Sequence, residues 1–364
     1  MKKELPEQMT AVYLTGHGGI ETLEYRGDIP VPVAGGGEVL IKVSAAGVNN
    51  TDINTRIGWY SKKVVDATNT GGADGFEEVD DADATWSGVA MEFPRIQGAD
   101  CCGIIVAVGE GVDESRIGQR VLVRNMLRSY VDYRPYECWT LGSECDGAFA
   151  QYTRAPAAET YRVDCDWSDE ELASIPCAYS TAENMLHRAG VGIERVLVTG
   201  ASGGVGSAAV QLAKRRGAQV IGIASAEKME DLRKLGADEV IDRNTDLVEA
   251  LGSDSVDVVV DLVAGDGWPL LLDVLKRGGR YVTAGAIAGP LVELDVRTLY
   301  LKDLTLIGCT FQEDIVFENL VGYIERGEIR PLVAKTFPLA EIAEAQQVFL
   351  DKKFTGKLVL IPPA

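Results

Sequence analysis

Short apolar runs broken by glycine and proline fill the chain from Met9 to about Tyr161. Clear examples occupy residues 38–43, 103–108 and 120–123, and each is bounded by glycine or polar residues. Apolar runs of this length between turn residues are typical of β-strands. This part of the chain therefore predicts a compact structure of antiparallel sheets.

From about Cys165 the pattern changes to apolar strands that alternate with helical stretches. The strands are expected at 195–199, 220–224, 257–261, 280–284 and 304–308, and the helices at 204–216, 227–235 and 268–275. After Phe311 the pattern ends in helices at 317–326 and 340–350 and a strand at 357–361. Alternation of this kind predicts an α/β fold with a parallel, doubly wound sheet.

Residues 61–93 fit neither pattern. They hold eight acidic residues against two lysines, three glycines between positions 71 and 75, and little periodicity. A loop of this length inside a compact domain is usually a functional cover or a locally disordered insertion. Both interpretations stay open from the sequence.

Length and charge narrow the class of protein. A chain of 364 residues favours two domains. Lys plus Arg number 35 against 55 Asp plus Glu, a net charge of −20, which disfavours nucleic acid and membrane partners because both need surface cations. We found no apolar run long enough to cross a bilayer and no secretory signal, so we expect a cytoplasmic protein with a small-molecule substrate.

A glycine-rich turn stands between the strand at 195–199 and the helix at 204–216. This strand–turn–helix context distinguishes a dinucleotide-binding turn from a chance cluster of glycines. A side chain at Gly203 or Gly204 would keep the backbone from the pyrophosphate, and the helix N-terminus supplies free N–H groups. The expected cofactor-binding residues of the turn are Ser202, Gly203, Gly204, Val205 and Gly206.

The next strand lacks the acidic residue that accepts hydrogen bonds from the ribose in NAD-selective sites. It ends at Ala224 and Ser225, and Lys228 and Arg243 lie close by in the sequence. Cations without an acid suit a 2′-phosphate, so we predict that NADP(H) is preferred over NAD(H). Glu227 weakens this prediction, and Lys228 and Arg243 could instead be solvated surface charges.

Seven motifs together resemble the medium-chain dehydrogenase/reductase superfamily. They are GEVLIKV at 37–43, GVNNTD at 47–52, VGEGV at 108–112, DGAFAQY at 146–152, ASGGVG at 201–206, LGAD at 235–238 and GGR at 278–280. The resemblance covers nearly the whole chain outside residues 61–93 and about 124–142. It implies a GroES-like, mostly-β catalytic domain at 1–164 and 313–364, with the insertion at about 61–93, and a Rossmann domain at 165–312.

The zinc-dependent alcohol dehydrogenases of this superfamily carry metal ligands that this chain largely lacks. Asn49 stands where they have a cysteine, and Gly98-Ala99-Asp100 where they have a His-Glu pair after glycine. Only Cys177 occupies a ligand position, and a catalytic zinc normally needs three protein ligands. The stretch that corresponds to the structural zinc lobe has only Cys138 and Cys145. We therefore expect no zinc.

Asn49 with Asp52, followed by Gly58-Trp59-Tyr60, is similar to the zinc-free quinone oxidoreductases and enoyl reductases. The resemblance implies that Tyr60, Asn49 and Asp52 are the catalytic candidates, with Trp59 and Tyr60 in the substrate pocket. It also implies that Thr181 lies along the nicotinamide. Tyr60 could donate a proton or orient the acceptor carbonyl, or it could be only an aromatic wall.

Without a metal, hydride transfer favours an acceptor whose new charge is delocalised, such as a quinone or an α,β-unsaturated carbonyl. Two alternatives remain: a zinc-free alcohol dehydrogenase or aldehyde reductase, and a non-catalytic NADPH-binding protein that resembles the lens crystallins. The strand at 304–308 should be an unpaired sheet edge, which predicts a homodimer.

Overall fold

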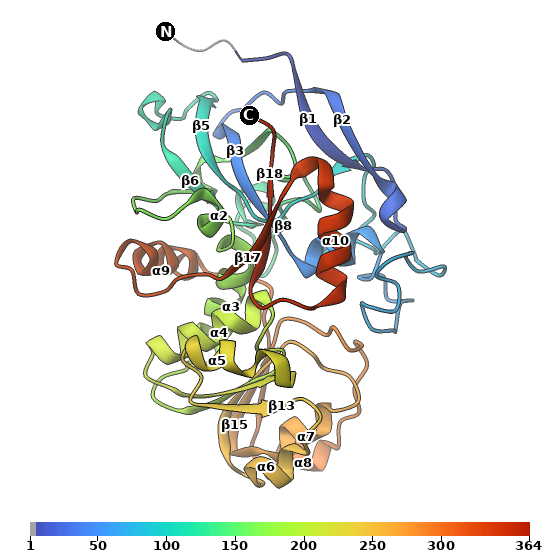
Figure 1. Ribbon diagram of the computed structural model, residues 1–364, viewed down its shortest axis with the longest axis vertical. Coiled ribbons are helices and arrows are strands. Elements are labelled where there is room, and N and C mark those ends of the chain that lie inside the picture. Colours follow the sequence, from blue (N-terminus) through green and yellow to red (C-terminus); the bar gives the residue numbers. More distant parts are fainter. Residues whose placement is uncertain (1–4) are drawn as a thin grey trace.

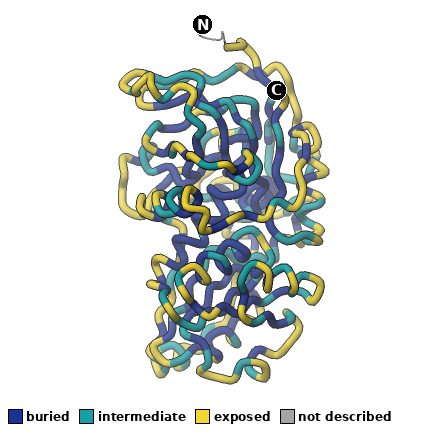
Figure 2. Tube along the Cα trace, turned by 60° about the vertical axis from the view of Figure 1, so that its left-hand side comes forward, coloured by how far each residue is buried: buried dark blue, intermediate teal, exposed yellow. Residues whose placement is uncertain are grey.

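The computed structural model describes residues 5–364 as two lobes, a mostly-β upper lobe and an α/β lower lobe in the view of Figure 1. Each lobe has a buried interior and an exposed outer surface (Figure 2). Within residues 5–364 no helix is long and apolar enough to cross a membrane.

The upper lobe is built mainly from antiparallel strands, as predicted for the first part of the chain. Its largest sheet has the order β10-β6-β5-β3-β18-β17, with β9 also paired to β3, and a smaller sheet has the order β2-β1-β4. The elements up to the second helix are β1 (Gln8–Leu14), β2 (Leu23–Pro30), β3 (Glu38–Val48), α1 (Asn50–Arg56), β4 (Arg95–Ile96), β5 (Cys102–Val108), β6 (Arg120–Val123), β7 (Met126–Leu127), β8 (Trp139–Thr140), β9 (Tyr152–Pro156), β10 (Thr160–Arg162) and α2 (Asp169–Leu172).

The lower lobe holds a six-stranded sheet of order β13-β12-β11-β14-β15-β16 in which all neighbours are parallel. Its elements are β11 (Arg195–Val198), α4 (Gly204–Arg215), β12 (Gln219–Ala224), α5 (Met229–Lys234), β13 (Glu239–Asp242), α6 (Leu247–Leu251), β14 (Val256–Asp261), α7 (Trp268–Asp273), β15 (Leu275–Thr283), α8 (Val296–Leu301) and β16 (Thr305–Gly308).

Strand β11 explains why the sheet is covered on both faces. Val196 and Val198 belong to one apolar cluster, whereas Leu197 between them belongs to another on the opposite face. All three side chains are fully buried. A strand that is apolar at every position needs helices on both faces, and this confirms the predicted doubly wound sheet.

Helix α3 (Pro176–Arg188) lies between the lobes, and the last part of the chain returns to the upper lobe (Figure 1). The returning elements are α9 (Asp314–Glu325), β17 (Val333–Pro338), α10 (Ile342–Asp351) and β18 (Lys357–Ile361). Strand β18 pairs antiparallel with β3 and parallel with β17. Short 3-10 helices occur at Ile20–Thr22, Glu114–Arg116, Ser129–Val131, Ala157–Glu159, Ala226–Lys228 and Leu339–Glu341.

Candidate active site

The N-terminus of α1 places Asn49 and Asp52 side by side. The Asn49 backbone amide donates to Asp52 Oδ2 at 2.7 Å, and the Ala99 amide donates to Asp52 Oδ1 at 3.4 Å. Burial, together with the charge of Asp100, raises the pKa of Asp52 to about 7, although the backbone amides of Asn49 and Ala99 and the charge of Lys357 lower it. Asp52 therefore caps the helix and holds it against the segment that carries Asp100.

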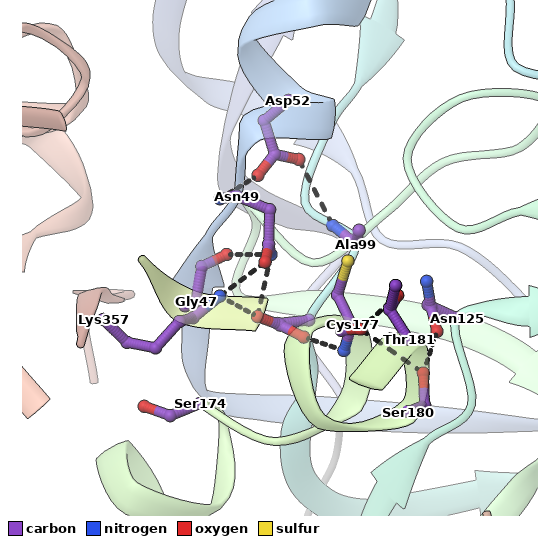
Figure 3. A network of polar contacts seen from close by, with 12 residues as sticks. Gly47, Asn49, Asp52, Ala99, Asn125, Ser174, Cys177, Ser180, Thr181 and Lys357 are labelled. Atoms are coloured by element: carbon purple, nitrogen blue, oxygen red, sulfur yellow. Dashed lines mark hydrogen bonds and ion pairs between the residues drawn. The ribbon is translucent and has the colours of Figure 1, made fainter. Parts of the chain in front are cut away.

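Lys357, the first residue of β18, is the centre of a buried polar network (Figure 3). Its ammonium donates to Asn49 Oδ1 at 2.5 Å and to Asp100 Oδ2 at 2.8 Å. The Asn49 amide also donates to Asp100 Oδ2 at 2.8 Å, and Asp100 Oδ1 accepts the Cys177 backbone N–H at 2.6 Å. The side chains of Lys357 and Asp100 are 4% and 0% exposed, so this ion pair is shielded from water.

The side chains of this network show whether a catalytic metal could bind here. Asn49, Asp100 and Cys177 occupy the neighbourhood where the resemblance would place metal ligands, and the Lys357 ammonium is bonded to two of them. Burial, together with the charge of Asp100, raises the pKa of the Cys177 thiol, which opposes formation of the thiolate that zinc requires. Within residues 5–364, no group of three His, Cys, Asp or Glu side chains is placed to hold a metal ion. These residues do not fit a catalytic zinc.

Tyr60 lies beside this network. Its hydroxyl donates to Thr51 Oγ1 at 3.1 Å, and its ring packs edge-on against Trp59 and Trp86 at centroid distances of 5.7 and 5.0 Å. Burial raises the pKa of Tyr60 far above its usual value, and the neighbouring Cys177 and Asp52 raise it further. The phenol therefore stays protonated and can donate a hydrogen bond.

Helix α3 presents Cys177 in its first turn and Thr181 one turn later (Figure 3). The Thr181 hydroxyl donates to the Cys177 carbonyl at 2.8 Å, which fixes the side chain on the helix. Thr181 remains partly exposed, so its methyl and hydroxyl groups can still contact a ligand.

The glycine turn ends at α4 and leaves its first amides free. Within residues 5–364, the amides of Gly204, Val205 and Gly206 donate no hydrogen bond, whereas that of Ser207 donates to Gly203 O at 2.8 Å. A Cβ on Gly206 would lie 2.2 Å from Gly200 O, so only glycine allows this packing. Free amides at a helix N-terminus suit a pyrophosphate.

Lys357 joins the glycine turn to the polar network. A Cβ on Gly204 would lie 3.0 Å from Lys357 Cδ, so the lysine stem runs past the turn while its ammonium reaches Asn49. The Gly356 amide donates to Ser202 O at 3.3 Å. The structure thus places the turn next to Asn49, Asp100 and Cys177, an arrangement that local sequence patterns did not predict.

The end of β12 gathers several cations. The Arg243 amide donates to Ala224 O at 2.9 Å, and the Lys228 ammonium donates to the Lys352 carbonyl. Burial and the charge of Arg243 lower the pKa of Lys228, and burial and the charge of Lys228 lower the pKa of Lys352 to about 7. Lys228 and Arg243 therefore lie together beside Ser225, and Lys352 is a third basic side chain that sequence reasoning missed.

Comparisons with known proteins agree with this architecture. Residues 35–164 match the family model for the alcohol dehydrogenase GroES-like domain, and residues 204–326 match the model for zinc-binding dehydrogenase. A quinone oxidoreductase from Lama guanicoe is 30% identical, with 97% of each chain covered. The chain belongs to the medium-chain dehydrogenase/reductase superfamily, in its quinone oxidoreductase-like branch.

Two further proteins match nearly the whole chain. An acryloyl-coenzyme A reductase from Metallosphaera sedula is 30% identical over 97% of this chain and 99% of its own. A solved structure of a proposed alcohol dehydrogenase from Sinorhizobium meliloti 1021 is 45% identical, with a TM-score of 0.87 over 99% of this chain and 98% of its own. The comparisons support an oxidoreductase that binds a nicotinamide cofactor, and the fold resemblance predicted from the motifs is confirmed.

Proposed function

We propose that this protein is a zinc-independent, NADP(H)-dependent oxidoreductase that reduces a quinone or an α,β-unsaturated carbonyl compound. The observation that carries the proposal is the Lys357 ammonium, which binds Asn49 and Asp100 where related alcohol dehydrogenases use metal ligands. A fixed positive charge there disfavours a second cation and leaves the reaction to hydrogen bonds.

The bound dinucleotide supplies the hydride, and the protein must orient it and stabilise the charge that appears on the acceptor. The free amides of Gly204 to Gly206 would hold the pyrophosphate, and Thr181 would contact the nicotinamide. Tyr60 has a single O–H proton, which it would donate to the acceptor oxygen while its own oxygen accepts the hydroxyl proton of Thr51, 3.1 Å away. Charge delocalised over an enolate or a hydroquinone anion is spread enough for a few such bonds to suffice.

The preference for NADP(H) rests on the cations at the end of β12. Lys228 and Arg243 are close enough for the charge of Arg243 to lower the pKa of Lys228, and Lys352, with a pKa of about 7, adds a third basic group. Two or three cations beside a ribose favour a 2′-phosphate, and Ser225 offers a hydroxyl at the same strand end.

The proposal is tested by assaying purified protein for bound metal and for oxidation of NADPH and NADH with a quinone, an enone and an aldehyde. We expect substoichiometric zinc, turnover with the quinone or the enone, and no loss of activity after dialysis against a chelator. Tyr60→Phe should lower kcat/KM by about 10²-fold or more, whereas Tyr25→Phe, at an exposed tyrosine of β2, should leave it unchanged. Stoichiometric zinc with activity that the chelator abolishes would overturn the proposal.

The alternative is an alcohol dehydrogenase or aldehyde reductase, which the 45% identity to the proposed alcohol dehydrogenase favours. Turnover of simple alcohols or aldehydes, with no reduction of enones or quinones, would decide for it.

We also propose that the chain forms a homodimer in the cytoplasm, with domain limits at 1–164 with 313–364 and at 165–312. Strand β16 lies at the end of its sheet, and Leu306 on it and Val296, Tyr300 and Leu301 on α8 are exposed apolar residues. An apolar sheet edge of this kind favours pairing with a second copy.

A further inference from the structure

Thr68, inside the segment of residues 61–93, is hydrogen-bonded to both lobes. Its backbone amide donates to the carbonyl of Ile287, which follows β15 in the lower lobe, at 3.2 Å. Its hydroxyl donates to Asn54 Oδ1 on α1 of the upper lobe at 3.1 Å. Thr68 is 1% exposed, so water competes little for either bond.

The fully buried guanidinium of Arg56, the last residue of α1, holds the next part of the segment. Its three nitrogens donate to Gly72 O at 2.5 Å, Gly18 O at 2.7 Å and Gln346 Oε1 at 2.8 Å. Burial lowers the pKa of Arg56 to about 10, so the group remains charged at neutral pH. Arg56 therefore joins the segment to the turn between β1 and β2 and to α10.

The far part of the segment is also attached. The amide and the hydroxyl of Ser87 donate to Glu144 Oε1 at 2.9 and 2.8 Å. Between these anchors Trp86 packs edge-on against Tyr60, while Ala84 and Thr85 beside it are buried. The segment contains no helix or strand, yet it is attached to the rest of the protein at Thr68, Gly72 and residues 86–87, in contrast to a locally disordered insertion.

We propose that residues 61–93 form a fixed wall of the acceptor site that Thr68 clasps to both lobes, and that Trp86 limits the size of the acceptor at Tyr60. This inference rests on the proposed function because it assumes that the acceptor lies at the Tyr60 hydroxyl. A mobile cover would contact one lobe and close on the other when the cofactor binds, whereas Thr68 bonds this wall to Ile287 of the lower lobe and to Asn54 of the upper lobe.

Trp86 is suited to discriminate by size. Trp59 flanks Tyr60 on another side, and its indole N–H donates to Asp66 O at 3.0 Å, which ties that ring to the segment as well. Removal of one indole opens space beside the tyrosine without removing the hydroxyl or its bond to Thr51. Bulky acceptors then gain access, and small acceptors lose a packing surface.

The size filter is tested with Trp86→Ala and the conservative Trp86→Phe, using NADPH with 1,4-benzoquinone and 2,6-di-tert-butyl-1,4-benzoquinone. Trp86→Ala should raise the ratio of kcat/KM for the bulky quinone over the small one by about tenfold or more, and Trp86→Phe should change it much less. The matched control is Trp139→Ala, at a partly exposed indole that packs on Tyr130 rather than on Tyr60. A ratio that Trp86→Ala leaves unchanged would overturn the role of Trp86.

The clasp is tested by hydrogen exchange, which does not depend on turnover. Peptides covering residues 64–76 of the full chain should be protected equally with and without NADPH. Thr68→Val, which removes only the bond to Asn54, should accelerate exchange there by about tenfold or more, whereas Thr70→Val, at an exposed position two residues on, should not. Complete exchange within seconds in the cofactor-free protein, or protection only with NADPH, would refute the clasp. If no quinone or enone is reduced, the proposed function fails while this measurement still reports on the clasp.

Discussion

Replacing Lys357 with methionine removes the ammonium from the buried network and keeps a side chain of similar length. Asp100, fully buried, would lose its counter-ion, and Asn49 Oδ1 would lose its donor. At the 2.8 Å that separates Lys357 Nζ from Asp100 Oδ2, the attraction is about 6 kcal/mol for an effective dielectric constant of about 20. Desolvation offsets part of this, and breaking a buried pair by deleting one partner typically costs about 3–5 kcal/mol.

This loss can be read as a fall in melting temperature. With an unfolding entropy of about 2.1 cal/mol/K per residue, 364 residues give about 0.8 kcal/mol/K, so the Tm should fall by about 4–7 °C. Differential scanning fluorimetry at neutral pH measures the shift. Lys335→Met is the matched control, because its ion pair with Glu344 is more than half exposed on both sides and should contribute little.

A double variant separates charge from packing. Adding Asp100→Asn to Lys357→Met removes the stranded carboxylate, so the double variant should melt above the single one. A Tm within about 1 °C of wild type for Lys357→Met, or equal losses in the single and double variants, would refute the view that the ion pair is what holds this site together.

Three further predictions concern the cofactor, the pH dependence and the assembly. Lys228→Ala combined with Arg243→Ala should weaken NADPH binding by at least tenfold, about 1.4 kcal/mol, and leave NADH unchanged in fluorescence titrations; equal effects on both would contradict the 2′-phosphate site. The pKa of Asp52 is raised from 3.8 to about 7, so the folded state binds the proton more tightly and stability from this group falls as the pH rises from about 4 to about 7. Asp52→Asn should therefore flatten the decline in Tm between about pH 4 and 7, and an unaltered slope would show that another group titrates. Leu306→Lys, at an exposed position on the edge strand β16, should convert the dimer to a monomer in light scattering. If the wild-type protein is a monomer at micromolar concentration, the proposed homodimer is wrong.

Local sequence patterns predicted the elements whose structure depends mainly on neighbouring residues. The apolar run at 195–199 and the glycines that follow it gave β11, the turn and α4, because a buried parallel strand and a dinucleotide turn each leave a continuous local signature. Short helices were harder: α6 and α8 contain five and six residues and had no prediction. Segments this short carry little periodicity, although α5 and α7, also of six residues each, lie within the helices predicted at 227–235 and 268–275.

The candidate site was predicted only in part, because its bonds join distant residues. Lys357 is 308 positions from Asn49 and 257 from Asp100, and it is the first residue of the apolar strand predicted at 357–361. That lysine directly after Gly356 was the available signal, since a charge at the start of a buried strand needs a partner. No sequence pattern pointed to Thr68. For residues 61–93 the composition left a functional cover and a disordered insertion both open, because acidity and glycine content do not encode contacts with the other lobe.

The order in which the ribosome makes the chain gives strand β18 a kinetic importance. Asp100 leaves the ribosome 257 residues before Lys357, a delay of about 13–50 s at a synthesis rate of about 5–20 residues per second. Throughout that interval β3 lacks the partner that it pairs with through Val48, Gly47 and Ala46, and it presents an open apolar edge. The nascent upper lobe therefore keeps an incomplete sheet edge until β18 is made, and the arrival of β18 covers that edge and supplies the counter-ion of Asp100.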